Sequence, residues 1–399
     1  MLDDKSEIPA DWDRSGLPGW AYFSNELFAL ERDMLFRTHW QLVCHISEVA
    51  DAGQYVTLDI ADERGLVIRG HDNEVRAFHN LCRHRGSRVV GDDRGTCNKA
   101  LICPYHGWAY NLDGTLRGIA SKDTFPPLDP DKWGLKPLEM EIWMGFVFVR
   151  FQPGPQPSVA TVMGRFDDEI RPYRTEDMIC REPTNIFEAA DVNWKSVRDV
   201  DNEGYHVRQA HPGLHDLYGE DYFDEPYING TSRSFGPFKE GPSKSWSVRN
   251  YRKILPKVDG LPDSHQNAWV YFGMFPNTVI GLYPDGVFFY QEIPVSPTQT
   301  KQRGGIVGHA DESREMKAAR YLSGRIDNDT VKEDQMLTIW ACEATKSSAF
   351  DGIMLSDLEY GLKTYHDHLR TIMPILSQTT EPTEGTLAQQ NTALLKERR

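Results

Sequence analysis

Two short segments in the first third of the chain each place a cysteine close to a histidine. Cys82 and His84 form a Cys-x-His pair, and after 18 intervening residues Cys103 and His106 form a Cys-x-x-His pair. Two thiolates and two imidazoles are the ligands of a 2Fe-2S cluster in which histidines replace cysteines on one iron, which raises the reduction potential. The sequence therefore predicts an electron carrier with these four residues as cluster ligands.

The mixed pairs argue against zinc, the other common metal for two cysteines and two histidines. Zinc sites of that composition usually group cysteine with cysteine and histidine with histidine. Gly86, Pro104 and Gly107 also permit tight loops whose backbone N–H groups can point at sulfur. Cys97 lies between the pairs and has no second loop cysteine to join it, so we expect a cluster without a supporting disulfide.

A second group of candidate metal ligands lies within residues 193–215. His206 and His211, together with a nearby carboxylate, suggest the two-histidine, one-carboxylate triad that leaves open positions for dioxygen on Fe(II). Residues five apart do not share a face of a regular helix, so we expect the helix to end at His211, where Pro212 disfavours it. His211 and His215 have i,i+4 spacing, but Pro212 lies between them and makes this pair the weaker candidate.

The elements that must position these ligands divide the chain into an all-β module and a mixed module. Helices are expected at 24–40, where Ser24 is a plausible N-cap, and at 329–345 and 356–374. The segments typical of β-strands are 55–58, 66–69, 75–78, 108–110, 146–149, 269–275, 278–283 and 287–293. The predicted parts are an N-terminal helical segment (1–40), a cluster domain ending at a proline-rich linker (41–155), a catalytic domain (156–378) and a polar, mobile C-terminal tail (379–399).

Composition excludes several kinds of partner. The chain has 399 residues and a formal net charge of −15, which opposes binding to nucleic acid or anionic membranes. Its apolar runs are too short to cross a bilayer, and its polar N-terminus is unlike a signal peptide. Six cysteines, two of them assigned as ligands, give no disulfide framework. We therefore expect a cytoplasmic protein with no nucleic-acid or membrane partner.

These motifs, in this order, resemble the α (oxygenase) subunit of the Rieske non-heme iron oxygenases, over about residues 20–375. The segments that carry the resemblance are Cys82–Gly86, Cys103–Trp108, Asn193-Trp194-Lys195 and Glu203-x-Tyr205-His206-x4-His211-Pro212. The resemblance implies an α+β chain with an N-terminal all-β Rieske domain and a C-terminal helix-grip catalytic domain, an antiparallel sheet with helices. It also implies assembly as trimers, with or without β subunits. Many members have Glu-Asn-Tyr where this chain has Asp199-Val200-Asp201.

The same resemblance implies the remaining site residues. The third ligand of the mononuclear iron would be Asp334, in a Glu333-Asp334 pair early in a helix, with Glu333 and the pair Asp199 and Asp201 as alternatives. Two carboxylates there would also suit the positive end of the helix dipole without any metal. Glu203 would bridge to a cluster histidine of a neighbouring subunit, His84 or His106, and so couple the two metal sites.

The resemblance further implies the reaction. A flavin or iron–sulfur reductase would pass electrons from NAD(P)H to the cluster, and O2 would hydroxylate a small substrate. The general layout resembles the branch that acts on quaternary ammonium compounds such as glycine betaine, stachydrine, carnitine and choline, so N-demethylation is expected. Aromatic residues that could cage a cation, or could equally form core, are Trp246, Tyr251, Trp269, Tyr271, Phe275, Tyr283 and Phe289. Two alternatives stay open: an oxygenase for an aromatic acid, and an electron-transfer protein without catalysis.

Overall fold

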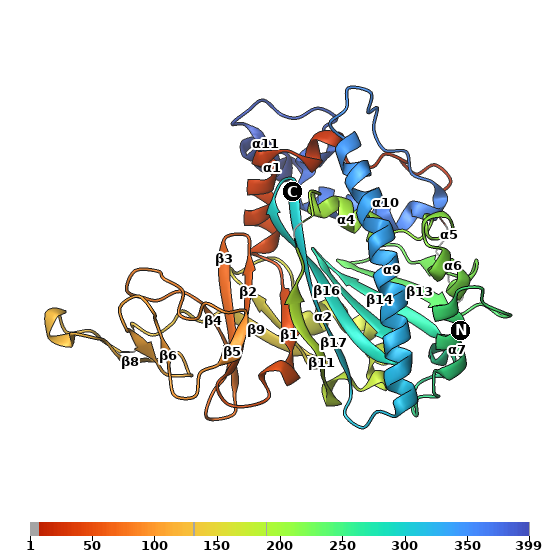
Figure 1. Cartoon of the computed structure of the whole chain (residues 1–399). Helices are drawn as coiled ribbons and strands as arrows, with labels where there is room; N and C mark the ends of the chain where they lie inside the picture. Colours follow the sequence, from red (N-terminus) through yellow and green to blue (C-terminus); the bar gives the residue numbers. More distant parts are fainter. Residues whose placement is uncertain (1–7, 131, 189, 399) are drawn as a thin grey trace.

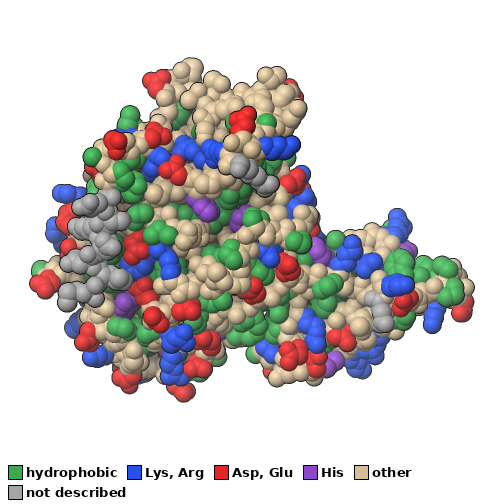
Figure 2. Space-filling model, turned by 180° about the vertical axis from the view of Figure 1, so that it is seen from behind, with side chains coloured by type: hydrophobic (Ala, Val, Ile, Leu, Met, Phe, Trp, Pro, Cys, Tyr) green, Lys and Arg blue, Asp and Glu red, His purple; other side chains and the backbone are tan. Residues whose placement is uncertain are grey.

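The structure, a computed structural model, describes residues 8–130, 132–188 and 190–398. A small all-β part projects from a larger part that is built on a seven-stranded sheet (Figure 1). The projection is also plain from behind, where acidic and basic side chains are interspersed over the surface (Figure 2). No described helix combines the length and the apolar character needed to cross a bilayer. The first seven residues, which carry the polar start of the sequence, lie outside the described part.

The projecting part consists of three small antiparallel sheets with strand orders β4-β3-β2-β5, β6-β7-β8 and β1-β10-β9. Their strands are β1 (Gln41–His45), β2 (Gln54–Ile60), β3 (Glu63–Arg69), β4 (Val75–His79), β5 (Arg94–Thr96), β6 (Leu101–Ile102), β7 (Ala109–Tyr110), β8 (Leu116–Gly118), β9 (Glu139–Trp143) and β10 (Phe146–Arg150). The first ligand pair lies in the loop between β4 and β5, and the second in the loop between β6 and β7. Cys82 and Cys103 belong to the apolar core beneath these loops, so the core itself holds the two loops together.

The larger part is organised by an antiparallel sheet with the order β11-β17-β16-β15-β14-β13-β12. Its strands are β11 (Met178–Ile186), β12 (Phe223–Asp224), β13 (Thr231–Pro237), β14 (Ala268–Met274), β15 (Thr278–Tyr283), β16 (Gly286–Ser296) and β17 (Gln299–His309). Strand alternation separates two faces. One face, with Phe272 and Ile280, packs against α2, α3 and strands of the projecting part. The other, with Trp269 and Tyr283, packs against α6, α7 and α9.

Helices cover both faces and the end of this sheet that lies next to α1 and α11 (Figure 1). They are α1 (Asn25–Glu31), α2 (Val159–Met163), α3 (Asp167–Ile170), α4 (Trp194–Asp201), α5 (Val207–Ala210), α6 (Pro212–Tyr218), α7 (Trp246–Ile254), α8 (Asp263–Gln266), α9 (Arg314–Ala344), α10 (Tyr360–Ile372) and α11 (Leu387–Glu397). Helix α9 begins 15 residues before the predicted start at 329, at a Ser313 cap. Its length lets one helix contact α4, α6 and α7.

Helix α1 is tied to helix α4 by a buried ion pair. Ser24 caps α1 by accepting a hydrogen bond from the N–H of Leu27, as predicted. At the other end of α1, Glu31 is fully buried and accepts hydrogen bonds from Lys195 Nζ at 2.5 Å and Trp194 Nε1 at 2.8 Å. The Trp194-Lys195 part of the sequence motif therefore fixes the helix that leads into the candidate iron site.

The C-terminal segment differs from its prediction as a polar, mobile tail over 379–399. It contains helix α11, which packs against α1. Leu387 is buried at its start, and the Asn391 side chain accepts a hydrogen bond from the N–H of Ile375 at 3.2 Å. Only two leucines of this mostly polar segment, Leu387 and Leu394, reach the core, which is why composition concealed the helix.

Candidate metal centres

The two cluster loops have matching backbone geometry. The N–H of Gly86 donates to the carbonyl of Cys82 at 2.9 Å, and the N–H of Gly107 donates to the carbonyl of Cys103 at 3.0 Å. Both glycines have positive φ, +73° and +70°, which side chains disfavour. Each loop therefore turns back on its cysteine and directs the following histidine toward the other loop.

The four predicted cluster ligands meet at the tips of these loops. The imidazole rings of His84 and His106 lie 4.7 Å apart in an edge-to-face arrangement, and His84 stacks on Trp108. Nδ1 of His84 is buried and has no hydrogen-bond partner among the described residues. Burial raises the pKa of the Cys82 thiol, and the neighbouring Cys103 adds to this shift. A buried imidazole nitrogen without a partner, beside two adjacent thiols, suits a 2Fe-2S group.

The loop cysteine between the two pairs takes no part in a disulfide. Cys97 is half-buried and forms no disulfide, and none of the five other cysteines forms one. The expectation of a cluster without a supporting disulfide therefore agrees with the structure.

His206 and His211 are brought together by a break between two short helices. His206 lies immediately before α5, and His211 lies immediately after it, with φ −118° and ψ 79° outside the helical region. Pro212 then opens α6. The helix thus ends at His211 as the sequence predicts, and the Nε2 atoms of the two rings lie 3.1 Å apart.

Asp334 completes the second site from the middle of α9. Its Oδ1 lies 2.8 Å from Nε2 of His211 and 3.7 Å from Nε2 of His206. One ligand atom from each of the three side chains falls within 4.8 Å of the others. Two imidazole nitrogens and one carboxylate oxygen that converge in this way suit a divalent iron with open coordination positions.

A second carboxylate supports each histidine of this triad. Nδ1 of His206 lies 2.5 Å from Oε1 of Glu203, whose Oε2 also accepts the N–H of His206 at 3.1 Å. Nδ1 of His211 lies 2.9 Å from Oε2 of Glu333. Glu203 makes its contact from the segment between α4 and α5. Both rings are therefore oriented by Nδ1, which leaves Nε2 for a metal.

The alternative ligands are engaged with other partners. Asp199 accepts hydrogen bonds from Tyr22 Oη at 2.5 Å and His366 Nε2 at 2.8 Å, and Asp201 pairs with Arg198 at 3.0 Å. His215 lies 3.1 Å from the carbonyl of Gly219 through Nδ1. Glu333 supports His211 in place of joining the triad. Sequence spacing could not distinguish supporting carboxylates from ligands, because both positions need the same residue types.

The structure shows which of the aromatic residues proposed for a cation cage belong to the core. Tyr251, Trp269, Phe275 and Phe289 are fully buried, and Trp246 is 57% exposed on α7. Tyr271 remains half-buried on the sheet face toward α9, and its hydroxyl lies 2.9 Å from that of the buried Tyr283. Sequence analysis missed Phe288 and Tyr290 on the same face.

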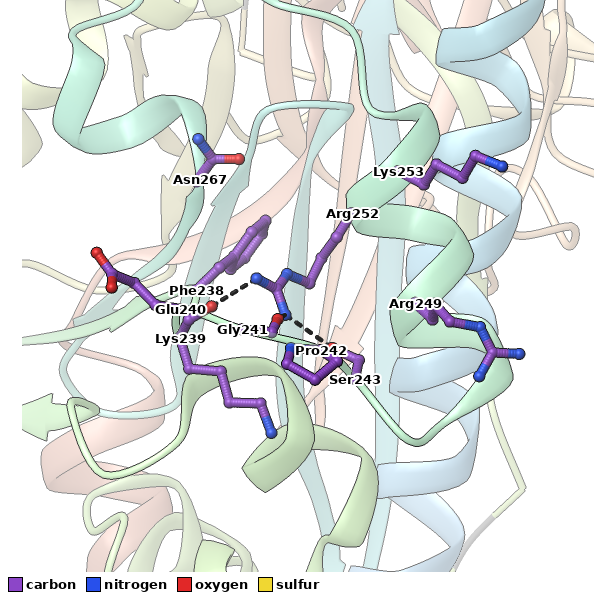
Figure 3. Close-up of a pocket in the computed structure, with 10 residues that line it drawn as sticks. All are labelled: Phe238, Lys239, Glu240, Gly241, Pro242, Ser243, Arg249, Arg252, Lys253 and Asn267. Carbon is purple, nitrogen blue, oxygen red and sulfur yellow. Dashed lines mark hydrogen bonds between the residues drawn. The ribbon is translucent and has the colours of Figure 1, made fainter.

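A pocket of about 460 Å³ lies near the start of α7 and is lined by none of the predicted site residues. Figure 3 shows Arg252 donating hydrogen bonds to the carbonyl of Lys239 and to Ser243, whereas Arg249 and Lys253 extend from the helix. Arg252 also donates to the carbonyl of Gly241. Because Arg252 is occupied by these bonds, we regard this pocket as a feature of the loop and not as the reaction site.

Comparisons with known proteins agree with this geometry. Residues 39–129 match the family "Rieske [2Fe-2S] domain", and residues 172–375 match "Ring hydroxylating alpha subunit (catalytic domain)". The chain is 37% identical over 348 residues to the glycine betaine monooxygenase oxygenase subunit of Chromohalobacter salexigens, covering 80% of this chain and 77% of that protein. It is 32% identical over 200 residues to the carnitine monooxygenase oxygenase subunit of Escherichia coli, covering 50% and 53%.

The fold has a close counterpart among solved structures. The quaternary ammonium Rieske monooxygenase CntA, solved in complex with an inhibitor, superposes with a TM-score of 0.75 at 22% identity, over 90% of this chain and 95% of that one. The predicted α+β architecture, an all-β Rieske domain followed by a sheet-and-helix catalytic domain, is therefore confirmed. The chain belongs to the ring-hydroxylating α subunits of the Rieske non-heme iron oxygenases, enzymes that use a 2Fe-2S cluster and a mononuclear iron.

Proposed function

We propose that this oxygenase N-demethylates a quaternary ammonium compound of the betaine or choline type. The observation that carries the reaction is the triad of His206, His211 and Asp334, each histidine of which is oriented by a further carboxylate. The substrate class is supported by the relatives, which are named for glycine betaine and carnitine. In this proposal Cys82, His84, Cys103 and His106 hold the cluster.

Electron transfer is proposed to cross between subunits of a homotrimer. Figure 1 shows the cluster loops, near β6 and β8, on the opposite side of the molecule from α5, the short helix between His206 and His211. A long separation within one chain favours a route from the cluster of a neighbouring subunit. Glu203 is well placed for it, because it contacts His206 while remaining only half-buried. Its carboxylate would accept from a cluster histidine of the partner and couple the two metals.

The carboxylates of the site orient the histidines before substrate and O2 bind. Glu203 and Glu333 hold both imidazoles by Nδ1, so that Nε2 of each, with Asp334, holds the iron. Iron held there would supply the activation of O2, and hydroxylation of an N-methyl carbon would consume O2, two electrons and two protons and release one water. The hydroxymethyl ammonium product then breaks its C–N bond and releases formaldehyde, a proton and the tertiary amine.

The test is an anaerobically purified, iron-loaded enzyme supplied with a reductase and NADH. Glycine betaine, choline and stachydrine are compared with benzoate, and formaldehyde is measured against oxygen consumed. Formaldehyde equal to oxygen uptake with one of the cations is the expected result. The matched control is His206→Ala, which should keep a reducible cluster and lose formaldehyde. Turnover of benzoate without turnover of any cation would assign the enzyme to aromatic acids, and an unchanged His206→Ala variant would remove the catalytic role of the triad.

A further inference from the structure

Helix α9 carries a second aspartate on the same face as Asp334. Asp327 precedes Asp334 by seven residues, which is two helical turns and about 10 Å along the axis. One oxygen of Asp327 accepts a hydrogen bond from Tyr283 Oη at 2.9 Å. Both aspartates therefore face the sheet, one beside the two histidines and the other beside the aromatic residues of β15.

The sheet presents aromatic side chains to this face of α9. Alternation along the strands places Tyr271, Tyr283, Phe288 and Tyr290 on the same side of the sheet. The rings of Tyr271 and Tyr283 are 5.9 Å apart at 88°, and Phe288 meets them at 73° with centroids 6.3 Å and 4.9 Å away. Tyr283 is buried, whereas Tyr271, Phe288 and Tyr290 are only half-buried although their strands are central. These three rings thus keep surface open on the α9 side.

A glycine makes this arrangement possible. Gly281 lies between Tyr271 and Phe288 in the strand register, and a Cβ there would lie 2.2 Å from the Phe288 ring. The ring therefore leans over the glycine, and its orientation depends on the absence of a side chain at this position.

Asp327 has no cationic partner within the described residues. Its side chain instead ends a row of hydroxyls, Tyr218–Tyr271–Tyr283, in which each step is 2.9 Å. Burial raises the pKa of Asp327 to about 8, against the opposing effect of the Tyr283 hydrogen bond. Ionising a buried carboxyl group that has no ion pair costs free energy. Such a group suits a ligand that brings the missing positive charge.

Arg198, a buried cation on this side of the sheet, is already paired with carboxylates. The Arg198 guanidinium lies over Gly273, on the same face as Tyr271, where a Cβ would be 3.4 Å from its Nη2. It pairs with Asp201 at 3.0 Å and lies 4.0 Å from Glu292, both of them carboxylates. The face between Asp334 and Asp327 is therefore anionic and aromatic, a combination that attracts a methylated ammonium.

We propose that Asp327, together with the half-buried rings of Tyr271, Phe288 and Tyr290, binds the cationic nitrogen of the substrate and makes the enzyme select N-methylated cations over neutral molecules of the same shape. The inference rests on the proposed function and adds the residues that bind the substrate. In this arrangement the cation lies between the two aspartates, with one methyl group toward the iron site and the charged nitrogen near Asp327. Cation–π contact to the rings and attraction to the carboxylate then act on the same group.

The test compares choline with its neutral isostere 3,3-dimethylbutan-1-ol, in which carbon replaces the nitrogen. Binding to the iron-loaded, oxygen-free enzyme is measured by calorimetry at pH 9, where Asp327 is charged, for the wild type, Asp327→Asn and the control Asp329→Asn. Asp329 lies on the same helix and loses the same charge, but its side chain is exposed. We expect the wild type to bind choline with a Kd at least about tenfold lower than that of the alcohol. Asp327→Asn should lose most of this difference in Kd. Asp329→Asn should keep it.

The ratio of the two affinities separates recognition from folding, because a merely structural role for Asp327 would weaken both ligands alike. Equal affinities in the wild type, or an unchanged ratio in Asp327→Asn, would overturn the inference. Tyr283→Phe provides a second variant that keeps the ring and frees Asp327 from its hydrogen bond, and it should retain the preference for choline. If choline is preferred but no cation is demethylated, the proposed function fails while the binding role of Asp327 stands.

Discussion

Nδ1 of His211 lies 2.9 Å from Glu333, while Nε2 of the same ring lies 2.8 Å from Asp334. Two consecutive residues of α9 therefore contact the two nitrogens of one imidazole. A carboxylate at Nδ1 keeps the proton on that nitrogen and leaves the Nε2 lone pair for a metal. The Glu-Asp pair in the sequence thus has two functions, support and ligation, which spacing alone could not separate.

Replacing Glu333 by alanine should weaken iron binding. With no acceptor at Nδ1, the ring can rotate or change tautomer, and loss of such a supporting carboxylate typically costs roughly 10–100-fold in metal affinity. Iron titration against a chelator measures the change, and the cluster absorbance should be unaffected. Glu343→Ala, an exposed site on the same helix, is the control. An iron affinity equal to that of the wild type would show that Glu333 does not position His211.

Glu203→Gln should slow electron transfer more than it weakens iron binding. Glutamine can still accept a hydrogen bond from Nδ1 of His206, but it lacks the charge that would stabilise protonated histidines on both sides of a subunit boundary. Stopped-flow oxidation of the reduced cluster, in the presence of O2 and substrate, should be slower by at least roughly tenfold. Glu220→Gln, an exposed site, serves as the control. Normal cluster oxidation in a variant with full iron would exclude Glu203 as the bridge.

The sequence was most informative where residue type alone limits the chemistry. The four cluster ligands and the histidine pair could be chosen because few other groupings of cysteine and histidine were present, and Pro212 marked the helix end that brings His206 and His211 together. The strand predicted at 278–283 coincides with β15, since its run of β-branched and aromatic residues has no competing helical period.

The remaining features depend on contacts between distant segments. Asp327 looks like any surface acid of a helix, and only the packing of α9 on β15 shows its bond to Tyr283, 44 residues away. Glu31 is likewise an ordinary helical residue until α4 brings Lys195 to it, 164 residues later. Helix α9 was also predicted 15 residues too short; its first half buries Ala319, Leu322 and Ile326 in the core that it shares with α7.

Removing Glu31 should destabilise the protein more than any surface substitution. Glu31→Ala leaves the buried Lys195 ammonium without its partner at 2.5 Å, and breaking a buried pair typically costs about 3–5 kcal/mol of unfolding free energy. Denaturant unfolding measures the loss. The double variant Glu31→Leu with Lys195→Met removes both charges and should recover most of the stability. A single variant as stable as the wild type would mean that α1 does not depend on this pair.

Choline affinity should rise with pH through about 8, the value to which burial raises the pKa of Asp327. Above that pH the carboxylate is charged and attracts the cation, whereas 3,3-dimethylbutan-1-ol should bind equally at pH 6.5 and 9. The titratable groups whose charges interact with Asp327 are Tyr218, Tyr251, Tyr271, Tyr283 and Asp285. The tyrosines have pKa values raised by burial and stay neutral in this range, so Asp327→Asn should flatten the choline profile. A profile that persists in Asp327→Asn would assign the pH dependence to another group.

Asp327 should also lower the stability of the ligand-free enzyme at alkaline pH. The folded-state pKa of Asp327, about 8, lies above the ordinary value of 3.8, so the folded state binds the extra proton between these values and loses stability as the pH rises. At pH 6 the unfolded wild type already carries this charge while the folded protein holds the proton, so Asp327→Asn should be more stable than the wild type there, and the difference should grow as the pH rises to about 8. At pH 9 the difference in melting temperature should have levelled off at its full value, because the variant has no carboxylate to bury. Added choline should reduce this difference by stabilising only the wild type. A variant equally stable or less stable at pH 9 would show that Asp327 is compensated within the protein and is not reserved for a cation.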